Sequence, residues 1–152
     1  MAHSVTIHPI DNREDYLELF LMADESEAVV RSYLHQGDAF AFHDEGNVVG
    51  ACLITYPHPD EAEIKNIALK ENARGKGLGK QAIHKLTGCL QSTEASKLIV
   101  GTANCSIENI IFYQKAGFRF SFIRKGFFDS YPHPFYENGI QGRDLVYFEK
   151  PL

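Results

Sequence analysis

The sequence predicts an α/β fold built on a mixed sheet, and three observations lead to this prediction. Segments with the two-residue period of strands alternate with segments of helical period along nearly all of the 152 residues. The hydrophobic fraction of 44% argues against intrinsic disorder and supports a real core. A helical segment separates the strands expected at Glu61–Leu69 and Lys97–Thr102, as a crossover between parallel neighbours requires.

The first half of the chain predicts three strands and two helices. Apolar residues recur at helical spacing between Asp11 and His35, with a break near Asp24–Ser26, and Gly37 closes the region. An Asp-Glu-Gly turn at residues 44–46 joins two strand-like runs into a hairpin. The predicted strands are His3–Pro9, Asp38–His43 and Asn47–Tyr56.

The second half predicts two helices and four strands. An apolar stripe from Leu78 to about Thr93 marks the first helix. Ser106 as N-cap and Gly117 after the last turn bound the second helix. The predicted strands are Glu61–Leu69, Lys97–Thr102, Phe118–Ile123 and Gln141–Lys150. The connecting segments are a turn with Pro57 and Pro59 and an aromatic-rich loop at Lys125–Gly139.

Composition and charge argue against several classes of protein. A net charge of −5 is unfavourable for a dedicated nucleic-acid binder, which needs clustered positive charge. The first ten residues carry no signal-peptide pattern, and no window approaches the roughly 20 apolar residues of a membrane span. Cys52, Cys89 and Cys105 are odd in number and widely spaced, so neither a disulfide framework nor a zinc site is indicated. We therefore expect one cytoplasmic domain over residues 1–152, with no metal and no membrane partner.

A glycine-rich segment with several cations predicts a phosphate-binding loop at the start of a helix. Glycines let the backbone approach a ligand closely, and the exposed N–H groups of a helix start attract anions. The residues are Arg74, Gly75, Lys76, Gly77, Leu78, Gly79 and Lys80.

Two general phosphate motifs do not account for this loop. The Walker A pattern fails because Gly75 and Gly79 are one residue too close and Gln81 follows Lys80 where a hydroxyl is required. The segment Gly77–Ala82 matches the dinucleotide pattern G-x-G-x-x-A, but the preceding strand ends too early, near Leu69.

Two sequence hallmarks resemble the GCN5-related N-acetyltransferase (GNAT) family. The strand Glu63–Leu69 followed by Arg74–Gly79 is similar to its acetyl-CoA-binding core, and Asn109–Phe118 is similar to its second motif, a helix ending in Tyr-x-Lys-x-Gly-Phe. The resemblance implies the GNAT fold: a mixed, mostly antiparallel seven-stranded sheet with helices on both faces. Its central parallel pair, Glu61–Leu69 and Lys97–Thr102, would splay apart.

The resemblance also implies where acetyl-CoA binds. The pyrophosphate would lie on the backbone of Arg74–Lys80, and the pantetheine arm would pair with backbone groups of Ile67, Ala68 and Leu69. Ser106 stands where the family often has an asparagine, so either Asn104 or Asn109 would take that contact.

For catalysis, the resemblance assigns the general acid to Tyr113 and, in some family members, the general base to a residue at the position of Glu63. A lysine-like acceptor has a pKa near 10.4 and must lose a proton before it attacks the thioester. A water chain, or His58 and His133 meeting at the acceptor mouth, are the alternatives for the base. The competing interpretation for each residue is a packing or surface role.

We therefore expect an N-acetyltransferase that moves an acetyl group from acetyl-CoA to a primary amine by direct attack in a ternary complex. The acceptor would be a small molecule or a peptide, and the aromatic-rich loop would shape its pocket or form a homodimer contact. A non-catalytic acyl-CoA sensor of the same fold is the main alternative. A dinucleotide-dependent oxidoreductase is a more distant one.

Overall fold

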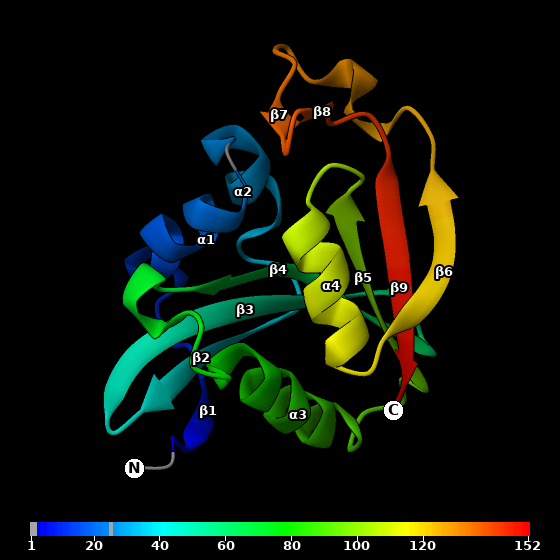
Figure 1. Ribbon diagram of the computed structural model, residues 1–152. Coiled ribbons are helices and arrows are strands. Elements are labelled where there is room, and N and C mark those ends of the chain that lie inside the picture. The colour runs from blue at the N-terminus through cyan, green and yellow to red at the C-terminus, as the bar shows by residue number, and fades with distance from the viewer. Residues whose placement is uncertain (1–2, 25) are drawn as a thin grey trace.

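A seven-stranded sheet runs through the centre of the computed structural model, which describes residues 3–24 and 26–152 (Figure 1). The strands lie in the order β1-β2-β3-β4-β5-β9-β6, and all neighbours are antiparallel except the parallel pair β4 and β5. The predicted mixed sheet with a parallel central pair is thus confirmed. The strands are β1 (Val5–Pro9), β2 (Asp38–Asp44), β3 (Asn47–His58), β4 (Glu61–Leu69), β5 (Lys97–Ala103), β6 (Arg119–Arg124) and β9 (Leu145–Pro151).

Helices cover both faces of this sheet. On one face lie α3 and α4, and on the other lie α1 and α2 (Figure 1). The helices are α1 (Leu17–Ala23), α2 (Glu27–Tyr33), α3 (Leu78–Leu90) and α4 (Ile107–Lys115), with short 3₁₀ turns η1 (Arg13–Tyr16), η2 (Glu71–Ala73) and η3 (Phe127–Ser130). None of the helices in the described part of the chain is both long and apolar enough to cross a membrane.

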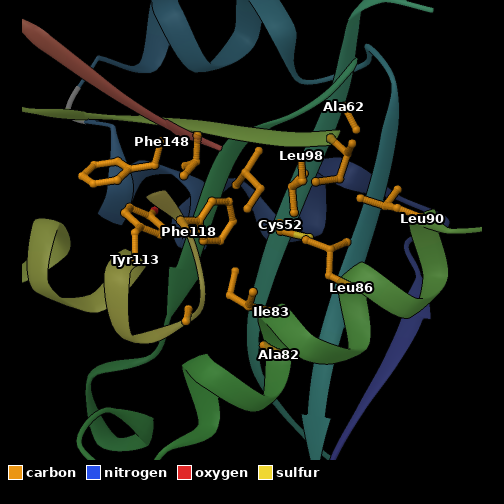
Figure 2. Packing of buried hydrophobic residues seen from close by; sticks show 14 of the residues in the cluster. Cys52, Ala62, Ala82, Ile83, Leu86, Leu90, Leu98, Tyr113, Phe118 and Phe148 are labelled. Atoms are coloured by element: carbon orange, nitrogen blue, oxygen red, sulfur yellow. The ribbon is translucent and has the colours of Figure 1, made fainter. Parts of the chain in front are cut away.

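Alternation along β3 divides the core between the two faces. Cys52 and Ile54 join the cluster under α3, whereas Ala51 and Leu53 join the cluster under α1 and α2. Successive residues of a strand point to opposite faces, so one central strand serves both clusters. In Figure 2, the α3 side chains Ala82, Ile83, Leu86 and Leu90 point toward the sheet, where Cys52 and Leu98 lie.

Local capping chemistry explains where α2 begins and where α4 ends. Ser26 begins α2 by accepting a hydrogen bond from the Val29 amide on its side-chain oxygen at 3.3 Å. The break predicted near Asp24–Ser26 is therefore present, although Glu25 lies outside the described residues. After α4, Gly117 adopts a φ of 97°, which ends the helix as the sequence predicts.

The last part of the chain differs from the prediction. A single strand was expected over Gln141–Lys150, but β9 begins only at Leu145, and Gln141 belongs to a separate small hairpin. That hairpin consists of β7 (Tyr136–Glu137) and β8 (Ile140–Gln141). The strands are separated because the Asn104 side chain accepts hydrogen bonds from the amides of Arg143 and Asp144, which bends the chain before β9 starts.

Smaller differences concern the ends of several elements. The turn predicted at Pro57 lies later, because β3 continues to His58, and α3 ends at Leu90 rather than near Thr93. The loop predicted over Lys125–Gly139 contains η3 and β7.

Candidate active site

The parallel strands β4 and β5 separate halfway along their length. Paired residues run from Glu61 opposite Lys97 to Ile64 opposite Val100, and the pairing stops there. β4 continues to Leu69 and β5 to Ala103. The splay expected for this pair is therefore present, and it leaves the β5-facing backbone edge of residues 65–69 open.

A β-bulge lies at the point of separation. β3 pairs Leu53 with Asn66 but Ile54 with Ile64, so Lys65 is an extra residue in β4. The bulge reverses the alternation of side chains: Ile64 packs in the cluster under α3, whereas the Asn66 side chain reaches the opposite face.

Asn66 connects the bulge to the helix pair α1 and α2. Its Nδ2 donates to the Phe20 carbonyl at 2.9 Å and to the Tyr33 hydroxyl at 2.8 Å. Asn66 is 5% exposed, and its Oδ1 is the buried side-chain polar atom of the described residues that has no partner. The side chain thus fixes the helices against the splayed half of β4.

The glycine-rich loop begins directly after β4 and η2 and ends in α3. Gly75 and Gly77 adopt φ values of 75° and 76°, and no atom lies within 4 Å of a Cβ built at either position. The first α3 hydrogen bond runs from the Gln81 amide to the Gly77 carbonyl at 3.2 Å, so the amides of residues 78–80 have no acceptor within the helix. No side chain caps this end.

The charges around the loop favour an anion. The first turn of α3 contains no acidic residue, and Arg74, Lys76 and Lys80 are exposed. Arg74 also donates from Nε to the Leu69 carbonyl at 3.3 Å, which ties the loop to the end of β4. A helix N-terminus, open backbone and three cations together fit a phosphate or pyrophosphate group.

The start of α3 packs closely on its neighbours. Leu78 and Gly79 are buried, and a Cβ at Gly79 would lie 3.0 Å from Phe112 Cε1 and 3.1 Å from Leu69 Cδ1. The absence of a side chain at Gly79 thus lets the helix approach both β4 and α4. For these two residues only backbone groups are available to a ligand.

Glu63 lies on β4 just before the strands separate, opposite Ile99 of β5. Its Oε2 accepts a hydrogen bond from the Tyr147 hydroxyl of β9 at 3.1 Å, and the residue is partly buried. No partner of Oε1 is found among the described residues. A carboxylate held by one oxygen beside a splayed pair of strands is a reasonable proton acceptor.

Tyr113 is the buried residue of α4, and it is 6% exposed. Its ring packs edge-on against Phe112 and Phe118 and lies 5.9 Å from the Phe148 ring. Figure 2 shows Tyr113 beside Phe118 and Phe148. Burial raises the pKa of the Tyr113 phenol, so it keeps its proton at neutral pH. The ring is therefore a core residue, and its hydroxyl remains a donor.

The two asparagines near the start of α4 have different partners. Asn104 donates to the Gln141 carbonyl at 3.1 Å and accepts from the amides of Arg143 and Asp144, so its whole amide anchors the approach to β9. Asn109 is exposed and donates to the Thr102 hydroxyl at 3.2 Å, at the splayed end of β5.

The histidines considered as alternative bases lie far apart. His58 pairs with Glu61 where β4 begins, whereas His133 belongs to the loop beyond the other end of the sheet. The seven residues of β5 span about 20 Å between these two ends. The expectation that His58 and His133 meet at one mouth is therefore wrong.

The aromatic-rich loop, together with Gln141 and Gly142, lines an open hollow of about 310 Å³. Its wall includes Phe128, Tyr131 and Phe135, whose rings contact one another, together with Asp129 and His133. Ser106 hydrogen-bonds Glu137 at 3.1 Å, which docks the β7–β8 hairpin onto the start of α4. These contacts place the loop beside the end of β5 and the start of β9 (Figure 1).

Two other kinds of site would require a cluster of metal-binding side chains or a reactive thiol. No group of three or more metal-binding side chains is found in residues 3–24 and 26–152. Cys52 and Cys105 are buried and Cys89 is exposed, all as free thiols. Burial raises the pKa of the Cys105 thiol, which disfavours a thiolate nucleophile.

Sequence reasoning did not identify Asn66 and Tyr147. A polar residue inside an apolar strand was the available signal for Asn66, since buried asparagine needs hydrogen-bond partners. For Tyr147 the signal was Gly101, a glycine inside a strand, which often marks a close approach. Neither signal names the partner, because the Asn66 contacts depend on how α1 and α2 pack on the sheet and the Tyr147 contact depends on strand register.

Comparisons with known proteins agree with this geometry. A family model described as "Acetyltransferase (GNAT) family" matches residues 7–118. The uncharacterized N-acetyltransferase YvbK of Bacillus subtilis is 34% identical over 137 residues, which cover 90% of this chain and 88% of that protein.

Two solved structures are similar over nearly their whole length. A GNAT family acetyltransferase from Elizabethkingia anophelis with acetyl-CoA bound has a TM-score of 0.90 and 34% identity, covering 98% of this chain and 99% of that one. A Bacillus subtilis acetyltransferase in complex with CoA has a TM-score of 0.88 and 32% identity, covering 99% of both chains.

Proposed function

The chain belongs to the GNAT acetyltransferase family, and from this premise we propose that it transfers an acetyl group from acetyl-CoA to a primary amine. The reaction is a direct attack in a ternary complex. The observation that carries the proposal is one continuous arrangement: an anion-binding loop, the open edge of β4 and a carboxylate at the point of splay.

The donor lies along the first two parts of this arrangement. The amides of residues 78–80 and the cations Arg74, Lys76 and Lys80 hold the pyrophosphate. The pantetheine arm pairs with the open backbone edge that includes Ile67, Ala68 and Leu69, in place of the missing β5 partner. Acetyl-CoA bound to the Elizabethkingia relative supports this choice of donor.

Asn109, rather than Asn104, makes the side-chain contact with acetyl-CoA. Asn104 uses its amide nitrogen and oxygen to anchor the approach to β9. Asn109 stands at the splayed end of β5, where its side-chain amide donates one hydrogen bond, to the Thr102 hydroxyl.

Glu63 is the general base of the proposed reaction. A primary ammonium must lose a proton to attack, and Glu63 is the carboxylate that stands where β4 and β5 begin to separate. The amine nitrogen then bonds to the acetyl carbon, and the carbon–sulfur bond breaks. The base needs no metal, and much of the acceleration comes from holding amine and thioester together.

Tyr113 is the donor to the leaving sulfur. Its phenol keeps its proton at neutral pH because burial raises its pKa. A thiol has an ordinary pKa near 8.5, below that of a phenol, so Tyr113 acts by hydrogen-bonding the thiolate while solvent completes the protonation.

Release of free thiol from acetyl-CoA with a panel of primary amines distinguishes an enzyme from a sensor. The panel contains short peptides, diamines and amino acids. We expect amine-dependent release by the wild type, a fall with Glu63→Gln that is greatest near neutral pH, and a slower rate with Tyr113→Phe at unchanged CoA affinity.

Three results contradict parts of the proposal. CoA binding without thiol release for any amine would favour the sensor. Stabilisation by NAD and not by CoA would favour the oxidoreductase. An unchanged rate for Tyr113→Phe removes that residue from the mechanism.

A further inference from the structure

Tyr147 on β9 reaches across a whole strand to contact Glu63 on β4. In the sheet, β5 lies between these two strands, which places β4 and β9 about 10 Å apart. Tyr147 pairs with Gly101 of β5, and its hydroxyl donates to Glu63 Oε2 at 3.1 Å. The phenol ring therefore lies over the backbone of β5.

Gly101 provides the space for this crossing. A Cβ at Gly101 would lie 3.2 Å from Tyr147 Cζ, the carbon that carries the hydroxyl, and 3.0 Å from the Leu145 side chain. Glycine inside a strand weakens the strand, and it often marks a site where another group approaches closely. Here that group is the hydroxyl end of the Tyr147 ring.

Neighbouring side chains fix the ring in this position. Phe122 of β6 stacks on Tyr147 with ring centroids 4.5 Å apart and an interplanar angle of 9°. The Arg124 guanidinium lies 5.2 Å from the centroid of the Tyr147 ring. Tyr147 is 3% exposed. The hydroxyl thus has little freedom to leave the Glu63 carboxylate.

The phenol remains a hydrogen-bond donor at neutral pH. Burial, followed by the negative charge of Glu63, raises the pKa of Tyr147 to about 12, whereas Arg124 lowers it. Tyr147 therefore keeps its proton while Glu63 accepts one.

We propose that Tyr147 is a positioning residue, which holds Oε2 of Glu63 so that Oε1 takes the proton from the acceptor amine. The inference rests on the proposed function, because it assumes that Glu63 is the base. The ammonium proton passes to Oε1 and then to solvent, and Tyr147 ends each cycle in the state in which it began. Fixing the carboxylate saves the cost of orienting it during each reaction.

Tyr147→Phe tests the role of the hydroxyl while the ring and its stacking on Phe122 remain. We expect kcat for amine-dependent thiol release to fall about tenfold, the change expected when one hydrogen bond to a charged group is lost. The KM for acetyl-CoA should stay unchanged, since the donor loop lies elsewhere. Thermal unfolding of each variant shows that it is folded.

Tyr56→Phe is the matched control. The Tyr56 hydroxyl also donates to a carboxylate, at 2.7 Å, but its acceptor is Asp38 Oδ2 and not Glu63. We expect its kcat to equal that of the wild type. Gly101→Ala is a second variant, which keeps the Tyr147 hydroxyl but displaces it, and its kcat should fall by less than that of Tyr147→Phe.

A double-mutant cycle separates positioning from a purely structural effect. In a Glu63→Gln background, Tyr147→Phe should cause no further fall in kcat, because the group that it positions is already lost. A Tyr147→Phe enzyme with the kcat of the wild type would overturn the positioning role. So would a double variant whose fall in kcat is the product of the two single falls. Both results leave the proposed acetyltransferase function intact. A full rate for Glu63→Gln, or no thiol release by the wild type, would overturn the proposed base or function and this inference with it.

Discussion

Replacing Gly77 with alanine tests whether the loop before α3 needs a left-handed backbone. Gly77 caps α3 with φ 76° and ψ 7°, a region in which an L-residue is strained. No atom lies within 4 Å of a Cβ at this position, so the substitution adds no clash. In the folded state the substitution therefore adds backbone strain and no steric clash.

The expected magnitude follows from that strain. A left-handed conformation costs an L-residue roughly 1–2 kcal/mol in the folded state. In a chain of this length, each kcal/mol shifts the melting temperature by about 2–4 °C. We therefore expect Gly77→Ala to lower the melting temperature by about 2–8 °C.

Gly88→Ala provides a control of opposite sign within the same helix. Gly88 lies inside α3, is exposed, has no positive φ, and a Cβ at this position would have no atom within 4 Å. Alanine is favoured over glycine in a helix interior by about 0.5–1 kcal/mol, so this variant should be more stable than the wild type. Calorimetric melting of the three proteins without ligand measures both shifts. A Gly77→Ala protein that melts at or above the wild-type temperature would refute the reasoning.

Three further predictions concern other parts of the fold. Asn66→Ala removes the amide that donates to both the Phe20 carbonyl and the Tyr33 hydroxyl, and it should lower the free energy of unfolding in urea by about 1–3 kcal/mol. A urea unfolding midpoint equal to that of the wild type contradicts this prediction. Gly37→Ala places a Cβ against the Ile54 carbonyl oxygen, at a residue whose φ is 52°, and should lower the free energy of unfolding by at least about 4 kcal/mol. A soluble variant with the wild-type melting temperature would disprove this prediction. Burial and the nearby His8 lower the pKa of His43, so below about pH 6.5 the unfolded chain binds a proton more readily than the folded chain and the free energy of unfolding falls. His43→Gln should reduce this fall, and identical pH profiles of unfolding for the variant and the wild type count against the prediction.

The elements that the sequence predicted well are those with strong local signals. The apolar stripe of α3, the glycine-rich loop and the Ser106–Gly117 helix each depend on residues close together in the chain. The splay of β4 from β5 came from the family resemblance, and the register confirms it.

The features that sequence reasoning missed depend on distant contacts. The bulge at Lys65 is visible only when β3 and β4 are paired, and Tyr147 meets Glu63 only because β9 returns beside β5. The β7–β8 hairpin is held by hydrogen bonds that Asn104 donates to the Gln141 carbonyl and Ser106 donates to Glu137, each more than 30 residues away in sequence. Local periodicity contains no information about such pairings.

Transfer of an isotope-labelled acetyl group tests the central claim most directly. The protein is incubated with acetyl-CoA labelled in the acetyl group and with a primary amine that supports thiol release, and the products are analysed by mass spectrometry. We predict that the label appears in an amide of the amine, and that Glu63→Gln slows its appearance. Thiol release with the label found only in free acetate, or label bound covalently to the protein, would contradict direct transfer from acetyl-CoA to the amine.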